Sequence, residues 1–309
     1  MEAWKIAEVA SATRPYTVPA KGRTGVASAA RAACRLHAQG SISLKSTLQT
    51  GRSKPKGPTH LIRRHLPEGA RARCAFSVIV PAYNEQLVLE DAVERIATLL
   101  RDVDDYEIVI VEDGCTDYTP VVAATLRRRF PNVQHIHSLV RLGKGRAVSE
   151  GIRAARGEIL VLMDADMATD PEGLLDCINR VRAGDAHILV GSRYHPESRT
   201  ERTPLRLAYS RVYNAAATLL LGSRVRDHQC GFKVFDGDAV RSVVPFVRSD
   251  RFFWDTEVLA MAQWLGYTVK EVPITWREGT ASKVRLLRTP IEMFGSLLRL
   301  ACSRRVRAP

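Results

Sequence analysis

From residue 76 onward, short uninterrupted runs of apolar residues alternate with longer stretches whose apolar residues lie three and four positions apart. Residues 159–163 form the clearest run, with five apolar residues in a row. Such a run is typical of a strand buried on both faces of a parallel sheet, and the wider spacing is typical of a helix. The pattern predicts an α/β fold, a mainly parallel sheet with helices on both faces.

The same pattern predicts where the individual elements lie. Strands are expected at 76–80, 106–111, 133–137, 159–163, 187–190 and 268–276, and helices at 89–100, 120–130, 146–156, 171–182, 204–221, 238–247, 251–265 and 289–306. Residues 195–203 are expected to form a polar loop. The last helix should carry one apolar stripe, made of Ile291, Phe294, Leu297, Leu298 and Ala301, with arginines crowded at its end.

The formal net charge of +13 is concentrated at the start of the chain. Residues 1–75 hold 14 of the 46 basic and 3 of the 33 acidic residues, so the rest, with 32 and 30, is nearly neutral. This distribution disfavours a nucleic-acid partner. We expect a basic leader over 1–75, disordered apart from a short helix near 26–37, then a folded domain over 76–288 and a C-terminal helix with a basic tail over 289–309. The leader resembles either a transit peptide or an over-extended reading frame.

The six cysteines are scattered without metal-ligand spacing, which favours reduced thiols in a cytosolic compartment. No apolar run approaches the roughly 18–20 residues that span a bilayer. The expected location is therefore cytoplasmic, with any membrane contact peripheral.

Three polar clusters end three of the predicted strands, at 81–85, 112–117 and 164–166. The carboxyl ends of neighbouring parallel strands meet at one edge of a sheet, so these clusters should converge. Tyr83 offers an aromatic face for a base, and Asp113 offers an acceptor for base N–H groups. Asp164 and Asp166 offer hard oxygen ligands for a divalent cation that neutralises a diphosphate. Any one cluster alone would be an ordinary turn, but three in register favour a crevice that binds a nucleotide and a metal ion.

Other phosphate-binding motifs are absent from the sequence. No Gly-x-x-x-x-Gly-Lys-Ser/Thr is present, and no Gly-x-Gly-x-x-Gly follows the first strand. Lys144, between two glycines, is either a phosphate contact or a solvated lysine.

Five ordered motifs resemble family 2 glycosyltransferases of the GT-A fold: Pro-x-Tyr-Asn-Glu from Pro81, Val-x-Asp-Gly-x-x-Asp from Val111, Asp-x-Asp from Asp164, Gly-Ser-Arg from Gly191, and the strand order. The resemblance covers roughly residues 76–285. The stretches 227–233, 253–259 and 276–283 are most similar to dolichyl-phosphate glucosyltransferases and their mannose-synthase relatives. The Gln-x-x-Arg-Trp signature of processive synthases is absent, which favours a single transfer.

The resemblance implies roles for individual residues. A nucleoside diphosphate sugar would contact Pro81, Tyr83, Glu85, Val111, Asp113, Asp164, Ala165 and Met167. Mg²⁺ or Mn²⁺ would bind Asp164 and Asp166, the acceptor phosphate would meet Arg206 and Ser210, and the catalytic group would comprise Asp166, Arg193, Arg277 and Lys283. Cys115 replaces a serine of many relatives, and Ala168 replaces a polar metal ligand of some.

The expected reaction is an inverting transfer of a hexose, with glucose favoured, from a nucleoside diphosphate to dolichyl or another polyprenyl phosphate. A phosphate monoester is already ionised near pH 7, so this acceptor needs no strong general base. The helix at 204–221 and the C-terminal helix would dock on the membrane surface. A GDP-mannose enzyme, another acceptor, and a degenerate domain that only binds nucleotide or lipid remain alternatives. Asp255 and Glu257 are equally structural or catalytic, and His228 is interpreted as a surface residue.

Overall fold

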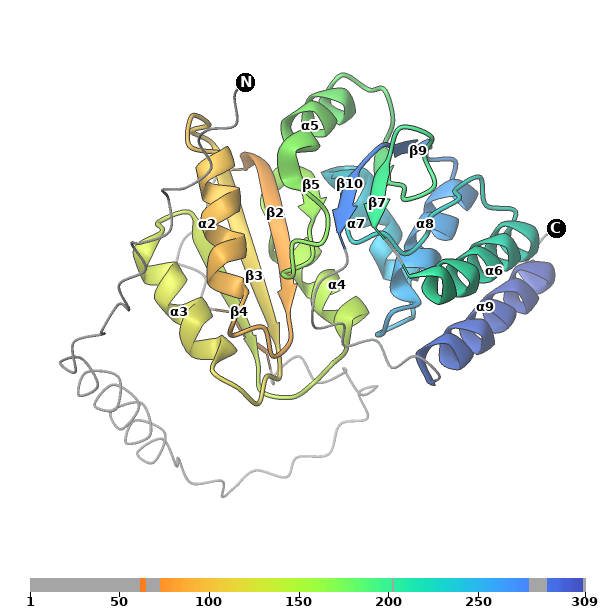
Figure 1. Cartoon of the computed structure of the whole chain (residues 1–309), viewed down its shortest axis with the longest axis horizontal. Coiled ribbons are helices and arrows are strands. Elements are labelled where there is room, and N and C mark those ends of the chain that lie inside the picture. The colour runs from red at the N-terminus through yellow and green to blue at the C-terminus, as the bar shows by residue number, and fades with distance from the viewer. Residues whose placement is uncertain (1–61, 65–72, 202, 278–287, 308–309) are drawn as a thin grey trace, which may run out of the picture. The chain divides into compact units, whose positions relative to one another are not determined.

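The computed structural model describes residues 62–64, 73–201, 203–277 and 288–307. Within these residues one sheet has the strand order β1-β4-β3-β2-β5-β8-β6-β9, of which Figure 1 labels β2, β3, β4, β5 and β9. Its strands are β1 (Ile62–Arg64), β2 (Cys74–Ala82), β3 (Tyr106–Asp113), β4 (Val133–Ser138), β5 (Gly157–Leu162), β6 (Ile188–Gly191), β8 (Lys233–Asp236) and β9 (Val269–Val272). A separate pair consists of β7 (Arg199–Glu201) and β10 (Thr275–Arg277).

Most strand pairs are parallel, as the apolar runs predict. β2 lies between β3 and β5 and is parallel to both, β3 is parallel to β4, and β6 is parallel to β9. β8 is inserted antiparallel between β5 and β6. Its pairing partners are distant in sequence, so the local pattern of residues does not reveal its place in the sheet.

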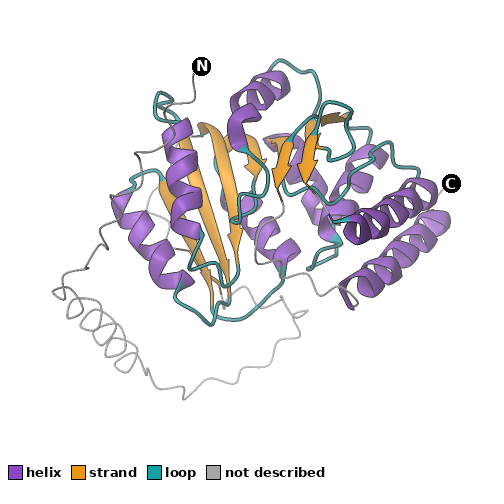
Figure 2. Ribbon diagram, in the orientation of Figure 1, coloured by secondary structure: helices purple, strands orange, loops and turns teal. Residues whose placement is uncertain are grey.

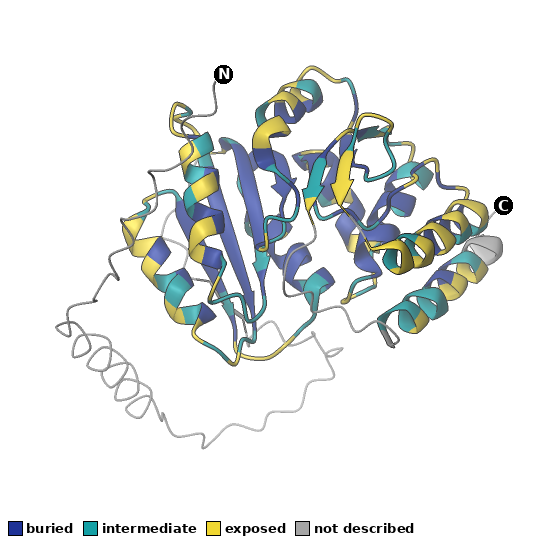
Figure 3. Cartoon of the chain, viewed as in Figure 1, coloured by how far each residue is buried: buried dark blue, intermediate teal, exposed yellow. Residues whose placement is uncertain are grey.

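Helices cover both faces of the sheet, which confirms the predicted α/β class (Figure 2). One face carries α2 (Leu89–Leu99), α3 (Thr119–Arg129) and α5 (Leu174–Arg182), which is preceded by a 3₁₀ turn at Pro171–Gly173. The other carries α4 (Lys144–Ala154), α7 (Gly237–Val243) with its 3₁₀ extension Val244–Phe246, and α8 (Trp254–Trp264). The central strands are buried on both faces (Figure 3), which explains why their sequences do not alternate.

Two expectations for the second half of the chain are wrong. Residues 199–201 form β7 rather than part of a polar loop, and the single strand expected at 268–276 is divided into β9 and β10. Pro273 lies at the division, where it has no N–H to give to a sheet. The neighbouring Ile274 N–H donates instead to Ser198 Oγ at 3.0 Å, and the Arg199 N–H donates to the Ile274 carbonyl.

Helices α6 (Pro204–Leu221) and α9 (Arg288–Arg307) pack side by side (Figure 1). Their shared apolar cluster contains Tyr213, Ala217, Leu221, Leu297 and Leu300, together with residues of α8. The stripe expected on the last helix is not buried as one face, because Leu297 is buried whereas Ile291 and Leu298 are 73% and 54% exposed. In the described part of the chain, no helix combines the length and apolar character needed to span a bilayer.

A short strand lies within the segment expected to be a disordered leader. β1 pairs antiparallel with the edge of β4, so the expectation is wrong for residues 62–64. The helix expected near 26–37 lies outside the described residues. Among the described cysteines, Cys74, Cys177 and Cys230 are buried thiols.

Candidate active site

The strand register brings the three polar clusters to one edge of the sheet. Pro81 lies opposite Val111 where β2 and β3 pair. On the other side of β2, the Met163 N–H donates to the Ile79 carbonyl, so the chain leaves β5 at nearly the same level. The polar clusters expected to bind the nucleoside and the metal ion therefore follow three neighbouring strands, β2, β3 and β5.

A tight turn presents the carboxylates of Asp164 and Asp166, and we call residues 164–168 the metal turn. The Met167 N–H donates to the Asp164 carbonyl, and Met167 has a left-handed backbone with φ of 50°. The Ala168 N–H donates to Asp166 Oδ1 at 3.1 Å. Ala165 is buried, whereas Asp166 is exposed, so the turn directs one apolar side chain inward and one acid outward. A non-glycine left-handed residue is a conformation that tends to occur at functional sites.

Strand β10 fixes the far side of the metal turn. The Arg277 N–H donates to the Ala168 carbonyl at 2.8 Å, and the Asp170 N–H donates to the Thr275 carbonyl at 2.9 Å. Between them, Thr169 and Trp276 form an isolated antiparallel bridge. The backbone of Arg277, a residue expected to be catalytic, thus lies directly against the turn, and its side chain is exposed. Lys283 lies outside the described residues.

An ammonium group balances the charge of the metal turn. Lys144 Nζ lies 2.9 Å from Asp164 Oδ1 and 3.7 Å from Asp255 Oδ2. The fully buried Lys233 Nζ lies 2.6 Å from the other oxygen of Asp255. Burial opposes ionisation of Asp164, but Lys144, Lys233 and Arg193 hold its pKa below the usual range. The pKa of Lys144 is raised, because its carboxylate partners outweigh burial.

This network bears on two interpretations that the sequence leaves open. Lys144 is not a solvated lysine, since its side chain is 20% exposed and pairs with the metal turn. Asp255 is 2% exposed and forms ion pairs with two lysines, and a catalytic role for it stays a prediction. Glu257 instead accepts the Ser249 N–H, and burial raises its pKa.

Gly231 borders the metal turn so closely that no side chain fits there. A Cβ on Gly231 would lie 1.9 Å from Asp164 Oδ2. The absence of a side chain is therefore needed to leave the Asp164 carboxylate in place. The spacing of the motif at 227–233 does not reveal this contact, because Gly231 is 67 positions from Asp164 in the sequence.

Arg193 is held by a buried carboxylate rather than exposed to solvent. Its Nε and Nη2 donate to Asp227 at 2.7 and 2.8 Å, and its backbone N–H donates to the same carboxylate. Burial opposes the charge of Arg193, but Asp227 raises its pKa further. The guanidinium also lies over the Trp276 ring, 5.5 Å from the centroid, next to the metal turn. Asp227 is a positioning residue that the sequence shows only as part of a motif.

Two of the residues expected to contact a nucleoside, Tyr83 and Asp113, contact the loop that runs from β4 to α4. Arg141 lies over the Tyr83 ring, 3.7 Å from its centroid, and so covers one face of the aromatic group expected to stack on a base. The Asp113 carboxylate accepts the N–H groups of Leu142 and Gly143 at 2.6 and 2.9 Å. Burial raises the pKa of Asp113. The expected contacts of Pro81, Tyr83, Glu85, Val111 and Asp113 with a nucleoside stay predictions.

Cys115 takes the place expected for a serine without losing hydrogen bonds. Its Sγ accepts the Asn84 N–H at 3.1 Å and donates to the Ala82 carbonyl at 3.6 Å. Burial raises the pKa of this thiol to about 12, so the group stays neutral and acts as a weak hydroxyl substitute.

The acceptor-phosphate candidates lie on α6, next to the loop that carries Arg193. Ser210 Oγ lies 2.5 Å from the hydroxyl of Tyr194, the residue after Arg193. Arg206 lies one helical turn earlier and is half-buried. Their expected contact with a phosphate stays a prediction, but the structure brings Ser210 to the side of the site where Arg193 lies.

The prediction that His228 lies on the surface is wrong. It is fully buried, with Nδ1 2.9 Å from Asn214 Oδ1 and Nε2 2.9 Å from Ser223 Oγ. Burial lowers the pKa of His228 to about 4. A polar loop motif gives no sign of burial, because the burial comes from packing against α6.

Comparisons with known proteins identify the family and the fold of this chain. A model of the family described as Glycosyl transferase family 2 matches residues 77–244. Glucosyl-3-phosphoglycerate synthase from Mycobacterium tuberculosis, in complex with Mn²⁺, UDP and glucosyl-3-phosphoglycerate, has a similar fold. The TM-score is 0.56 at 20% sequence identity, and the match covers 74% of this chain and 80% of that one.

Two relatives extend the match at the level of sequence. Glycosyltransferase AglD of Haloferax volcanii is 39% identical over 226 residues, which is 72% of this chain but 36% of that longer protein. Dolichyl-phosphate beta-glucosyltransferase ALG5A of Trichomonas vaginalis is 33% identical over 243 residues, which is 75% of each chain. The resemblance seen in the motifs is thus confirmed, and the chain belongs to glycosyl transferase family 2.

Proposed function

We propose that this glycosyltransferase moves glucose from UDP-glucose to dolichyl or another polyprenyl phosphate, with inversion and with a divalent cation. The observation that carries the proposal is the metal turn, with two acids at the end of β5 and Lys144 against Asp164. The relatives named for dolichyl-phosphate glucosyl transfer support the acceptor. The solved synthase that is named in complex with UDP-glucose and Mn²⁺ supports the donor and the cation.

The donor set of the metal turn fits a hard divalent cation. Asp164 and Asp166 offer carboxylate oxygens one residue apart, and the Asp164 side chain is 36% exposed. Mg²⁺ and Mn²⁺ bind such oxygens and take their remaining ligands from phosphates and water. When bound there, the cation would neutralise the departing nucleoside diphosphate.

The protein's own charges are suited to a phosphate acceptor. Arg193 is held in a fixed orientation by Asp227, so little side-chain freedom is lost when an anion binds near it. Arg206 and Ser210, on the neighbouring helix, would orient the acceptor phosphate. Its oxygen is the nucleophile that attacks the anomeric carbon, so the protein has no proton to remove at that atom.

An apolar stripe on α6 supports contact with a bilayer. Leu205, Tyr209, Val212 and Leu219 are 60%, 49%, 62% and 83% exposed, and their spacing places them on one side of the helix. Arg206 and Ser210 lie on the adjoining side, toward the domain. A polyprenyl acceptor has its phosphate at the membrane surface, so this arrangement would bring the phosphate to the site.

The test measures transfer of labelled sugar into lipid. Detergent-solubilised full chain is mixed with dolichyl phosphate, Mn²⁺ or Mg²⁺, and labelled UDP-glucose or GDP-mannose in parallel. We expect label from UDP-glucose to enter the lipid only when metal is present. Asp166→Asn should abolish this labelling, whereas Asp185→Asn, a control at a surface acid, should keep it. Labelling from GDP-mannose alone would show that the donor is GDP-mannose and not UDP-glucose. An α-linked product would contradict inversion. If neither donor labels lipid while UDP binds, the domain is a binder or uses another acceptor.

A further inference from the structure

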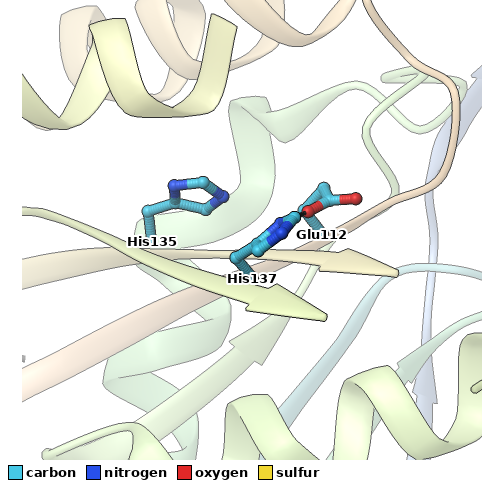
Figure 4. Close-up of side chains that lie close together, drawn as sticks. All are labelled: Glu112, His135 and His137. Atoms are coloured by element: carbon cyan, nitrogen blue, oxygen red, sulfur yellow. Dashed lines mark hydrogen bonds and ion pairs between the residues drawn. The ribbon is translucent and has the colours of Figure 1, made fainter. Parts of the chain in front are cut away.

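We propose that Glu112, His135 and His137 form a second metal site, which takes a zinc-class divalent ion. One ligand atom from each of these side chains lies within 4.8 Å of the others. Figure 4 shows the three side chains gathered at the ends of two neighbouring strands. Within the described residues, this is the one group of three or more such side chains that can meet on an ion.

Strand pairing is what brings the three ligands together. In the register of β3 and β4, Glu112 lies opposite His137, and Ile110 lies opposite His135. Paired residues of a parallel ladder project to the same face, and residues two apart on one strand do so as well. The three side chains therefore share one face, which α3 covers at β4. Rigid strands hold ligands more accurately than loops do.

The ligand set distinguishes this site from the metal turn. Two imidazoles and one carboxylate favour zinc and its transition-metal neighbours, whereas Mg²⁺ and Mn²⁺ prefer oxygen ligands. Zinc bonds of about 2.0–2.2 Å place tetrahedral ligand atoms about 3.4 Å apart, so binding requires side-chain shifts of about 1 Å, with Glu112 and His137 moving apart and His135 moving closer. The two sites are also separate in the sheet, because β2 lies between β3 and β5.

Glu112 is buried, and its carboxylate is also held by groups outside the three ligands. The Glu112 side chain is 0% exposed, and its Oε1 accepts the Cys115 N–H at 2.6 Å, which fixes the carboxylate plane. Glu112 Oε2 pairs with His137 Nδ1, so an ion would enter between groups already in contact. His137 is 25% exposed and gives the ion a path from solvent. An ion here would join β3 to β4 one residue before Asp113, the last residue of β3.

The test uses the full chain with Asp164→Asn and Asp166→Asn, so that the metal turn cannot contribute. Co²⁺ is titrated into this parent and followed by visible absorption, which distinguishes tetrahedral from octahedral coordination. His135→Gln and His137→Gln are compared with His187→Gln, a control outside the cluster whose imidazole accepts the Thr268 N–H and packs edge-on against the Tyr267 ring. We expect one equivalent of Co²⁺ in the parent and in the control, and at least tenfold weaker binding in the two cluster variants.

Two results would overturn the site: a parent that binds no Co²⁺, or cluster variants that bind Co²⁺ as the control does. Circular dichroism shows whether each variant is folded. A second measurement needs no histidine variant. Zn²⁺ at a saturating concentration, but not Mg²⁺, should raise the Tm of the parent by about 5 °C. An unchanged Tm would mean that Glu112 and His137 form an ion pair and nothing more. Neither measurement depends on sugar transfer. The proposal of a second metal site can therefore be disproved while the proposed function still holds.

Discussion

At the scale of single residues, buried polar groups decide how the site is held. Lys233, Asp227 and Asp255 have side chains that are at most 2% exposed, and each is paired with a group of opposite charge. Removing one member of such a pair leaves an uncompensated charge, which is why these positions tolerate change poorly. The sequence predicts the motifs that contain them but not the pairing, since the partners lie 22 to 34 positions apart.

His228 should make the stability of the fold depend on pH. An unfolded histidine titrates near pH 6.5, whereas burial lowers the pKa of folded His228 to about 4. Between these values the unfolded state binds more protons, so the free energy of unfolding falls as pH falls from 6.5 to 4, by about 3 kcal/mol. Urea unfolding across this range measures the loss. His228→Gln should flatten the dependence, and an equally steep curve in that variant would assign it to other groups.

Gly231→Ala should impair the site more than the fold. Its Cβ would lie 1.9 Å from Asp164 Oδ2, so the carboxylate must move, and a displacement of about 1 Å costs roughly 100-fold in rate. Gly173→Ala is the matched control, because a Cβ there meets nothing within 4 Å. Metal-dependent turnover of the two variants is compared. Similar turnover in both would mean that Asp164 does not depend on this contact.

At the scale of elements, hydrophobic periodicity predicts buried strands well but predicts short exposed strands poorly. The range expected for α6 matches the structure, and β2 to β6 lie within a few residues of their predicted positions. The short β7 has exposed side chains and is held by pairing with β10, so its sequence carries no apolar pattern. The partition of α9 into buried Leu297 and exposed Leu298 follows from packing against α6, which no helical pattern specifies.

The exposed stripe of α6 should control binding to membranes. Val212→Asp with Leu219→Asp places two charges on this stripe, and sedimentation with phospholipid vesicles should fall at least tenfold. Both side chains are exposed, so the fold should be unaffected. Val121→Asp on α3, where Val121 is 55% exposed, is the control and should sediment as the unchanged protein does. Equal sedimentation of all three proteins would show that the exposed stripe of α6 does not contact the membrane.

At the scale of the whole molecule, the sheet begins earlier than the change in composition indicates. The apolar pattern starts at residue 76, but β1 adds a strand at 62–64 to the edge of β4. Three residues in a basic stretch give no periodic signal, and their position is decided by an edge elsewhere in the fold. Sequence reasoning therefore predicts the fold class and the strand ends that carry the site, and it misses contacts made across the sheet.

Two shortened chains test the part played by β1. A chain that begins at Leu61 keeps the strand, whereas a chain that begins at Arg73 loses it and exposes the edge of β4. The second should be less stable by about 1–2 kcal/mol, because the ladder hydrogen bonds are lost. Thermal unfolding of the two chains measures the difference. Equal Tm values would show that the strand contributes nothing to stability.

The pairing of Lys144 with Asp164 also affects the order in which ligands bind. An ammonium beside the metal turn repels a free cation and attracts a free nucleoside diphosphate, so the two ligands should each increase the affinity for the other by the same factor. Metal and donor would then arrive and depart as a unit. We therefore expect the metal turn to hold no permanent cation: a chelator should stop turnover within the mixing time, and fresh cation should restore it as quickly.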